Sequence, residues 1–281
     1  MKTWKKIILG VSLISLFLGG GLVAWGYSQG GLTDLQNQTK SEQDYVKKEV
    51  KDFNKIDIKS SSYNVLIKNG DVDKATLSYY QKTKNPIDTS VKDGQLTIND
   101  NNSELDSTSN KHINFFGLKD LVRLSTLNKE VRNKTIVITL PKKQTIDFLK
   151  VDLATGNLDL SNSTIKQADI NLNVGDLTFT KMIVSNLKAN LDVGSVDSDH
   201  TLFTNSDLSI AMGDYSGDNL IFNGHNKLDV TSGDIEIVLK DYTLNVQADS
   251  HSGEVDITNN LKISKDNTLT ITSDLGDITV E

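Results

Sequence analysis

VGDLTF, at residues 174–179, is one of seven copies of a phrase in which a glycine precedes a small residue, usually acidic or an amide, and then an apolar residue. The other copies are TGNLDL (155–160), VGSVDS (193–198), MGDYSG (212–217), SGDIEI (232–237), SGEVDI (252–257) and LGDITV (275–280). The phrase glycines are Gly156, Gly175, Gly194, Gly213, Gly233, Gly253 and Gly276. Their spacings of 19, 19, 19, 20, 20 and 23 residues predict a stacked-repeat architecture.

Apolar residues recur at fixed distances from each phrase glycine. Two residues after it stand Leu158, Leu177, Val196, Tyr215, Ile235, Val255 and Ile278. Five before it stand Val151, Ile170, Ala189, Leu208, Leu228, Ala248 and Ile271. Three before it stand Leu153, Leu172, Leu191, Ile210 and Val230, then polar Ser250 and Ser273. Because side chains alternate along a strand, this pattern predicts two strands per repeat, each with an inward face.

The apolar positions three residues before and two residues after the glycine are separated by an odd number of residues. A regular strand would turn its inward face outward over that distance, so each phrase glycine is expected to mark a bend with unusual backbone angles. A further apolar position, nine residues after the glycine, predicts a second corner at Ile165, Val184, Phe203, Phe222 and Tyr242. The sequence therefore predicts an all-β fold, a parallel, β-helix-like β-solenoid of about 19–20 residues per rung, with each repeat stacked on the next.

The column that follows the phrase glycines is mostly acidic: Asn157, Asp176, Ser195, Asp214, Asp234, Glu254 and Asp277. Two interpretations compete. A stack of hard oxygen ligands would suit calcium, although the nine-residue glycine-rich calcium repeat is absent from the sequence. Alternatively, Asp and Asn hydrogen-bond their own backbone in turns. The second interpretation is favoured, and no metal or cofactor site is predicted.

The first 27 residues are expected to form a transmembrane anchor. Lys2, Lys5 and Lys6 precede an uncharged run at 7–27, whose 21 residues would span roughly 30 Å as a helix. The lysines place the N-terminus in the cytoplasm and the rest of the chain outside, so a single-pass cell-membrane protein is expected. A cleaved signal peptide is the alternative. Residues 28–52 are expected to be a polar stalk or linker, with some helix within 36–51.

Residues 53–281 are expected to form one extracellular domain. Its first part, 53–148, contains alternating runs at 53–59, 63–67, 75–80, 87–91 and 135–140. Asp93-Gly94 predicts a hairpin to 95–98. Residues 112–130 are expected to be a helical insertion. That insertion either caps an open end of the stack or exposes Phe115 and Phe116 as a contact patch for a membrane or a partner. Residues 149–281 hold the seven repeats.

The composition excludes several classes of function. Three of the 30 basic residues and none of the 37 acidic residues precede position 28, so the remainder carries 27 basic and 37 acidic side chains, a net charge of −10. Nucleic acid is therefore not an expected partner. No cysteine is present, which excludes disulfides and thiol catalysis. Acid pairs such as Asp207 with Asp214, or Asp197 with Asp199, do not stand out. No catalytic residues are predicted, and the chain is not expected to be an enzyme.

Several segments together resemble a known family. An N-terminal anchor, F-x-x-I-x-I at 53–58, D-G-x-L-x-I at 93–98, I-x-I-x-L-P at 136–141 and the glycine phrases are similar to the bacterial family DUF4097, labelled "putative adhesin". The anchored form resembles the LiaG-type proteins encoded near cell-envelope stress systems in Gram-positive bacteria. The resemblance covers about residues 50–281 and implies an architecture without catalytic residues.

The expected function is a non-catalytic, membrane-anchored extracellular interaction module, adhesin-like or associated with cell-envelope stress. Its partners would be the membrane, through the N-terminal helix, and other envelope proteins or wall polymers. The alternative is a carbohydrate-binding or carbohydrate-active solenoid that works on wall polymers. Any function is expected where the regularity breaks: at the 23-residue last spacing, at Ser250 and Ser273, or in the insertion at 112–127.

Overall fold

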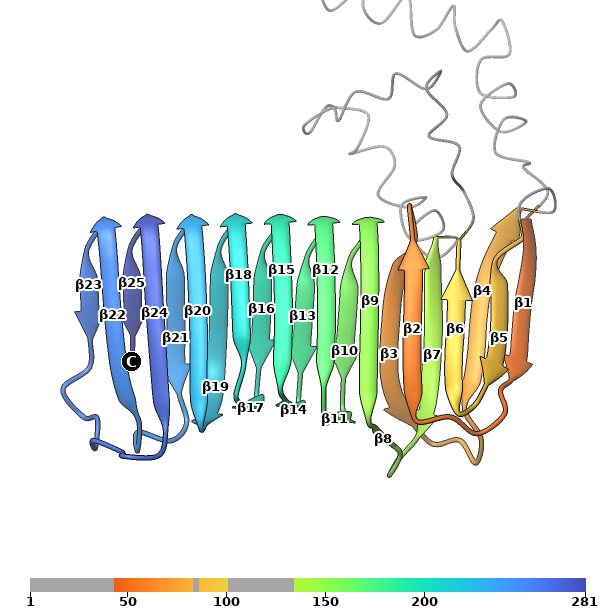
Figure 1. The fold of residues 1–281 in the computed structure, drawn as a ribbon, viewed down its shortest axis with the longest axis horizontal. Helices are drawn as coiled ribbons and strands as arrows, with labels where there is room; N and C mark the ends of the chain where they lie inside the picture. The colour runs from red at the N-terminus through yellow and green to blue at the C-terminus, as the bar shows by residue number, and fades with distance from the viewer. Residues whose placement is uncertain (1–42, 83–85, 101–133) are drawn as a thin grey trace, which may run out of the picture. The chain divides into compact units, whose positions relative to one another are not determined.

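The computed structural model describes residues 43–82, 86–100 and 134–281. Within them the chain forms 25 strands, most of which pair in parallel (Figure 1). The predicted anchor at 1–27 and the insertion at 112–130, including Phe115 and Phe116, lie outside the described residues. In the part of the chain that is described, no helix has the length and apolar content needed to span a membrane.

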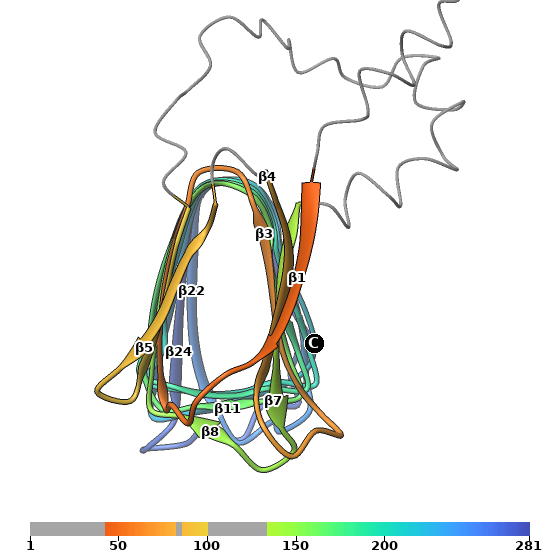
Figure 2. The same cartoon turned by 90° about the vertical axis from the view of Figure 1, so that its right-hand side faces the viewer.

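Two long sheets face each other, and a short third face joins them at one edge (Figure 2). The ten-stranded sheet has the spatial order β22 (Asn245–Ser252), β24 (Thr268–Leu275), β20 (His225–Ser232), β18 (Asp207–Met212), β15 (Leu187–Val193), β12 (Ala168–Val174), β9 (Phe148–Thr155), β2 (Lys55–Ser60), β6 (Gln95–Asn99) and β5 (Asp88–Lys92).

The second sheet has 15 strands, of which 11 line the opposite long face. These are β1 (Gln43–Glu49), β4 (Thr76–Lys82), β7 (Thr135–Pro141), β3 (Asn64–Gly70), β10 (Leu158–Ser161), β13 (Leu177–Thr180), β16 (Val196–Asp199), β19 (Tyr215–Asn223), β21 (Ile235–Leu239), β25 (Ile278–Val280) and β23 (Val255–Ile257). The third face holds β8 (Thr145–Ile146), β11 (Thr164–Ile165), β14 (Ile183–Ser185) and β17 (Leu202–Thr204). Because β19 pairs with both β16 and β17, it joins this face to the long sheet.

Strand pairing in the repeats follows the predicted period. Ile170 of β12 lies beside Val151 of β9 on one side and beside Ala189 of β15 on the other, an offset of 19 residues each way. Leu158, Leu177 and Val196 align in the same manner on the opposite sheet. Their side chains are buried between the two sheets. The all-β, parallel, solenoid-like architecture predicted from the repeats is therefore present.

The prediction that each repeat stacks on the next is wrong at the C-terminal end. The last repeat, with β24 and β25, lies between the fifth repeat (β20 and β21) and the sixth (β22 and β23). Side-chain size at two inward positions favours this order, because Ile271 and Ile278 of the last repeat lie opposite the smaller Ala248 and Val255 of the sixth. Ile271 and Ile278 of the last repeat are fully buried, whereas Ala248 of the sixth is partly buried and Val255 is 38% exposed. The repeat with the smaller inward side chains thus forms the end rung.

The N-terminal strands are also out of chain order. The rung of β2 and β3 lies between that of β9 and β10 and that of β6 and β7. The Asp93-Gly94 hairpin prediction is confirmed, because β5 and β6 pair antiparallel and both turn residues have positive φ, 51° and 74°. The helix expected within 36–51 is wrong at 43–49, where β1 neighbours β4 in the sheet. The folded unit begins at Asp44 and so includes part of the predicted linker.

Candidate ligand-binding groove

The phrase glycines lie on one edge of the solenoid, between the ends of the ten-stranded sheet and the starts of the opposite strands (Figure 1). Six of them have φ between 141° and 149°, a region that side chains disfavour; Gly253, in the end rung, does not. A Cβ atom on Gly194 would lie 1.9 Å from the carbonyl oxygen of Gly175. Each of these glycines therefore permits both the bend and the close approach of the neighbouring rung.

The acidic column beside these glycines forms a hydrogen-bonded ladder between rungs. The backbone N–H of Ser195 donates to Oδ1 of Asp176 at 3.0 Å, and that of Asp234 donates to Oδ1 of Asp214 at 2.9 Å. Further bonds of this kind join Asp176 to Asn157, Asp277 to Asp234, and Glu254 to Asp277. The favoured interpretation, bonds within each residue's own turn, is corrected, because these bonds reach the backbone of the adjacent rung. One oxygen of each of these acceptor side chains is satisfied without a metal ion.

The glycine edge is interrupted at the turn from β2 to β3. There Tyr63 takes the place of a phrase glycine, since the Cβ of an alanine at Gly156 would lie 2.4 Å from the Tyr63 carbonyl oxygen. The Tyr63 hydroxyl donates to the carbonyl oxygen of Tyr80 at 2.9 Å. Burial raises the pKa of Tyr63 to about 12, with smaller contributions from the charge of Asp100 and from Tyr79. This turn is thus built by side chains instead of by glycine.

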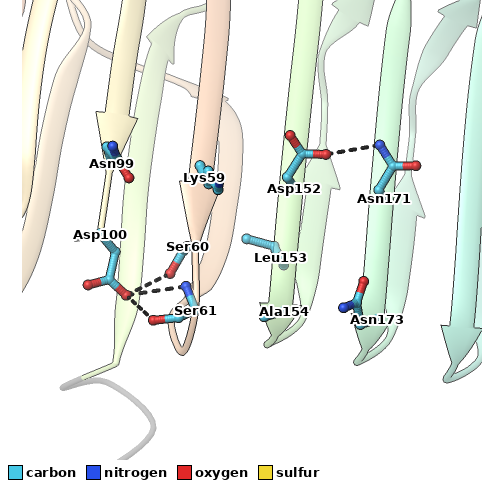
Figure 3. Close-up of a pocket in the computed structure, with 10 residues that line it drawn as sticks. All are labelled: Lys59, Ser60, Ser61, Asn99, Asp100, Asp152, Leu153, Ala154, Asn171 and Asn173. Atoms are coloured by element: carbon cyan, nitrogen blue, oxygen red, sulfur yellow. Dashed lines mark hydrogen bonds between the residues drawn. The ribbon is translucent and has the colours of Figure 1, made fainter. Parts of the chain in front are cut away.

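Asp100 holds the turn together from the neighbouring rung. Its carboxylate is buried and accepts hydrogen bonds from the Ser60 hydroxyl at 3.2 Å, the Ser61 hydroxyl at 3.1 Å and the Ser61 N–H at 3.4 Å (Figure 3). Ser60 in turn accepts the N–H of Tyr63 at 3.1 Å. Ser60 is in register with Leu153, which belongs to the apolar column three residues before the phrase glycines. In the rungs of β2 and β6, the hydrogen-bonded pair of Ser60 and Asp100 therefore takes the place of apolar residues in that column.

Beside this turn, on the outer surface of β6, β2, β9 and β12, lies a groove of about 420 Å³. Polar side chains line most of it: Lys59, Ser60, Ser61, Asn99, Asp100, Asp152, Asn171 and Asn173, with Leu153 and Ala154 (Figure 3). Lys59 is in register with both Asn99 and Asp152. The Asn171 amide donates to Asp152 Oδ1 at 2.9 Å. The groove therefore presents an ammonium, amides and carboxylates in fixed register.

This set of groups is suited to binding polar ligands. Amide and carboxylate groups can bind sugar hydroxyls by donating or accepting hydrogen bonds, but no aromatic side chain lines the described groove to stack on a sugar ring. Both carboxylates already accept hydrogen bonds. That arrangement suits holding a turn or a ligand better than donating a proton to a leaving group.

The groove residues were not predicted as a binding site from the sequence. One signal was present: a Ser-Ser-Ser-Tyr run at 60–63 stands where the rungs of the seven repeats have a glycine phrase. Ser250 and Ser273, where the repeat pattern is interrupted and function was expected, lie outside the groove. Ser250 donates to the carbonyl oxygen of Gly276 at 2.8 Å, and the hydroxyl oxygen of Ser273 is buried with no hydrogen-bond partner among the described residues. Asp207 begins β18 and Asp214 lies in the turn after that strand, whereas Asp197 and Asp199 both lie on β16.

Comparison with known proteins identifies the family. A family model described as Toastrack DUF4097 matches residues 53–281. The chain belongs to the DUF4097 family. The match covers every strand from β2 onward, so the groove lies wholly within the DUF4097 region.

Solved structures similar to this DUF4097 chain include a "putative cell adhesion protein" from Clostridium sporogenes, at 17% identity and TM-score 0.37, covering 85% of this chain and 99% of that one. Another is a "putative adhesin" from Bacteroides fragilis, at 16% identity and TM-score 0.37, covering 86% and 98%. A "putative lipid binding protein" from Parabacteroides distasonis shows 11% identity and TM-score 0.36, covering 86% and 98%. No curated protein matches the chain.

Proposed function

We propose that this DUF4097 protein is a non-catalytic interaction module of the cell envelope, anchored in the membrane by its N-terminal segment with the solenoid outside, and adhesin-like or associated with envelope stress. The observation that carries the interaction role is the polar groove at 59–61, 99–100, 152–154, 171 and 173. At the glycine edge the carboxylates accept backbone N–H groups of the adjacent rung, whereas this groove is open and lined by mixed donors and acceptors.

The anchor and its orientation are supported by the sequence. An uncharged run at 7–27 follows three lysines, which favour the cytoplasmic side. The acidic remainder of the chain would be repelled by an anionic membrane surface, so attachment falls to the N-terminal segment.

A second candidate is binding of wall polysaccharide in the groove. Lys59, Asp152, Asn171 and Asn173 supply the amide, carboxylate and ammonium groups that polar sugars require. Hydrogen bonds of this kind, each worth about 1 kcal/mol net, are consistent with weak binding that gains strength when many anchored copies meet one polymer.

Localisation and binding are tested separately. Protease added to intact cells should remove the solenoid and leave the N-terminal segment membrane-bound; protection of the solenoid would contradict the proposed topology. For binding, the detergent-solubilised full chain is sedimented with purified cell walls. We expect the double variant Lys59→Ala/Asn171→Ala to reduce binding about tenfold.

Lys188→Ala is the matched control for the wall-binding assay. It removes an exposed ammonium group from β15, one rung beyond the groove strand β12 and outside the groove. Equal loss in the control and in the groove variant would argue against the groove as the site. Release of reducing ends from the walls by the wild-type chain would contradict a non-catalytic role.

A further inference from the structure

A second cluster of polar side chains lies away from the groove, where the long face turns into the short third face. Asp199 ends β16, His200 follows it, and Asp218 lies one rung further along the stack, in register with Asp199. One ligand atom from each of these three side chains lies within 4.8 Å of the others. Nδ1 of His200 is 2.6 Å from Oδ1 of Asp199, and all three side chains are at least partly exposed.

The spacing of acidic residues on this sheet makes the pair Asp199 and Asp218 unusual. The outward column three residues after each phrase glycine alternates acid and hydroxyl in space: Asp159, Thr178, Asp197, Ser216, Glu236, Thr279 and Asp256. The next column runs Ser161, Thr180, Asp199 and Asp218. In these two columns of described strands, Asp199 and Asp218 are therefore the only acids on adjacent rungs. Like charges at about 4.8 Å repel, and here an imidazole lies beside them.

At the glycine edge, a hydrogen bond accounts for acids on adjacent rungs. Asp214 and Asp234 at the glycine edge are also on neighbouring rungs, but Asp214 accepts the Asp234 N–H at 2.9 Å. Asp218 instead accepts the Asn219 side-chain amide at 2.6 Å, and Asp199 contacts His200. Among the described residues, no lysine or arginine lies within ion-pair distance of Asp199 or Asp218. A cation would offset the repulsion that the ladder offsets elsewhere.

We propose that Asp199, His200 and Asp218 form a binding site for a divalent transition metal of the Zn²⁺ class. One imidazole and two carboxylates are ligands that Zn²⁺ accepts at about 2.0–2.2 Å. The imidazole favours Zn²⁺ over Ca²⁺, which prefers oxygen ligands. A shared ion at these lengths would require the side chains to rotate and shorten the present separations of up to 4.8 Å.

The site would keep an open coordination position. Three protein ligands leave a fourth position of a tetrahedral ion for water or another ligand. His200 also lines a cavity of about 170 Å³ that is bounded by Lys181, Asn219 and Lys240. The two lysines weaken attraction for a cation but favour an anion in the open position. The site therefore fits Zn²⁺ together with an anionic fourth ligand.

The sequence gives no metal motif for this site. Asp199 and His200 are adjacent, while Asp218 follows 19 residues after Asp199, a separation equal to one rung. Only the stacking of β16 on β19 brings the three side chains together. No metal site was predicted from the sequence, and the proposed site departs from that prediction.

Titration of the full chain with ZnCl₂ in a calorimeter tests the proposal. We expect saturable binding that weakens at least about tenfold in both His200→Asn and Asp218→Asn. Asparagine is a conservative choice at position 200, because Asn162 and Asn219 occupy the same corner of other rungs with φ of 52° and 55°, close to the 49° of His200. Thermal unfolding of each variant without metal verifies its fold.

Two variants serve as matched controls. His225→Asn removes an exposed histidine whose Nδ1 contacts Thr268, and Asp234→Asn changes an adjacent acid pair that has no histidine. Both should bind Zn²⁺ like the wild type. Co²⁺ should give visible d–d absorption in the wild type that is lost in His200→Asn. Absence of Zn²⁺ binding, equal weakening in the controls, or Ca²⁺ binding as tight as Zn²⁺ and insensitive to His200→Asn would overturn the proposal.

Discussion

Any side chain at position 194 would place its Cβ 1.9 Å from the carbonyl oxygen of Gly175. The obstacle is backbone, which cannot rotate away as a side chain can. The residue's φ of 149° adds a second constraint, because only glycine adopts it without strain. Two independent requirements, conformation and space, thus select the same residue.

Replacement of Gly194 by alanine should therefore be costly. Gly194→Ala is expected to lower the free energy of unfolding by at least about 2 kcal/mol, combining backbone strain with overpacking. Urea unfolding followed by circular dichroism measures it. Ser195→Ala, one residue on, is the control and should change stability by less than about 0.5 kcal/mol. Equal stability of Gly194→Ala and the wild type would contradict the tight corner.

Two tyrosines make stability sensitive to alkaline pH. Burial raises the pKa of Tyr63 to about 12, and complete burial raises the pKa of Tyr215 well above its ordinary value, partly offset by its hydrogen bond to Ser198. The folded state therefore holds these protons more tightly than the unfolded chain. The resulting stability is fully present below pH 10 and is lost as the pH rises through the folded pKa values.

We expect the double variant Tyr63→Phe/Tyr215→Phe to lose less stability than the wild type between pH 10 and pH 12. Denaturant midpoints measured at intervals across this range give the comparison. Tyr45→Phe, at a side chain that is 55% exposed, serves as the control and should follow the wild-type curve. Parallel pH curves for the double variant and the wild type would refute the assignment.

At the scale of elements, the edge ladder shows how a sheet tolerates a row of acids. Each carboxylate that accepts an N–H from the next rung replaces a bond that water would otherwise make. Asn157 and, one rung before it, Asn64 do the same with no charge. The acceptor oxygen, and not the charge, is therefore the structural requirement.

Substitutions at Asp176 separate these two contributions. Asp176→Ala leaves the Ser195 N–H without its acceptor and should destabilise the fold by about 1 kcal/mol. Asp176→Asn keeps an acceptor oxygen and should be neutral or slightly stabilising at low salt. Thermal unfolding in low and high salt tests both variants. If Asp176→Asn is as destabilising as Asp176→Ala, the charge is the requirement.

At the scale of the whole molecule, the order of the rungs is not the order of the chain. The column of Glu236, Thr279 and Asp256 illustrates the consequence. In chain order Glu236 and Asp256 would be adjacent acids, whereas in space Thr279 separates them. The buried Ile278 and the exposed Val255 agree with this order, since the interior rung carries the larger apolar side chains.

Cross-linking can verify the rung order, because the chain contains no cysteine. Glu236→Cys/Thr279→Cys joins neighbouring strands and should oxidise to a disulfide. Glu236→Cys/Asp256→Cys spans two rungs, about 9.6 Å, which exceeds the Cα separation that a disulfide allows. Mass spectrometry after mild oxidation distinguishes the pairs. Rapid cross-linking of the second pair alone would show that the rungs stack in the order of the chain, which would contradict the order in the structure.

The sequence alone was sufficient for the features set by local geometry. Apolar periodicity fixed the inward columns, and the odd interval across Gly175 and its counterparts required a bend. The 19-residue period predicted the rung, and the alternating runs before it were found as strands. The columns and the bend depend on residues within one repeat, and the period depends only on the spacing between successive copies.

Only the tertiary structure decided which rungs are neighbours. Stacking order depends on which inward side chains occupy the buried positions of the whole solenoid. In that order the last repeat lies between the fifth and the sixth, and β2 lies between β9 and β6. The same stacking set Asp100 against Ser60 and Asp218 against Asp199, pairs separated by 40 and 19 residues. No local pattern specifies such pairs, because parallel stacking brings together side chains that the chain itself keeps apart.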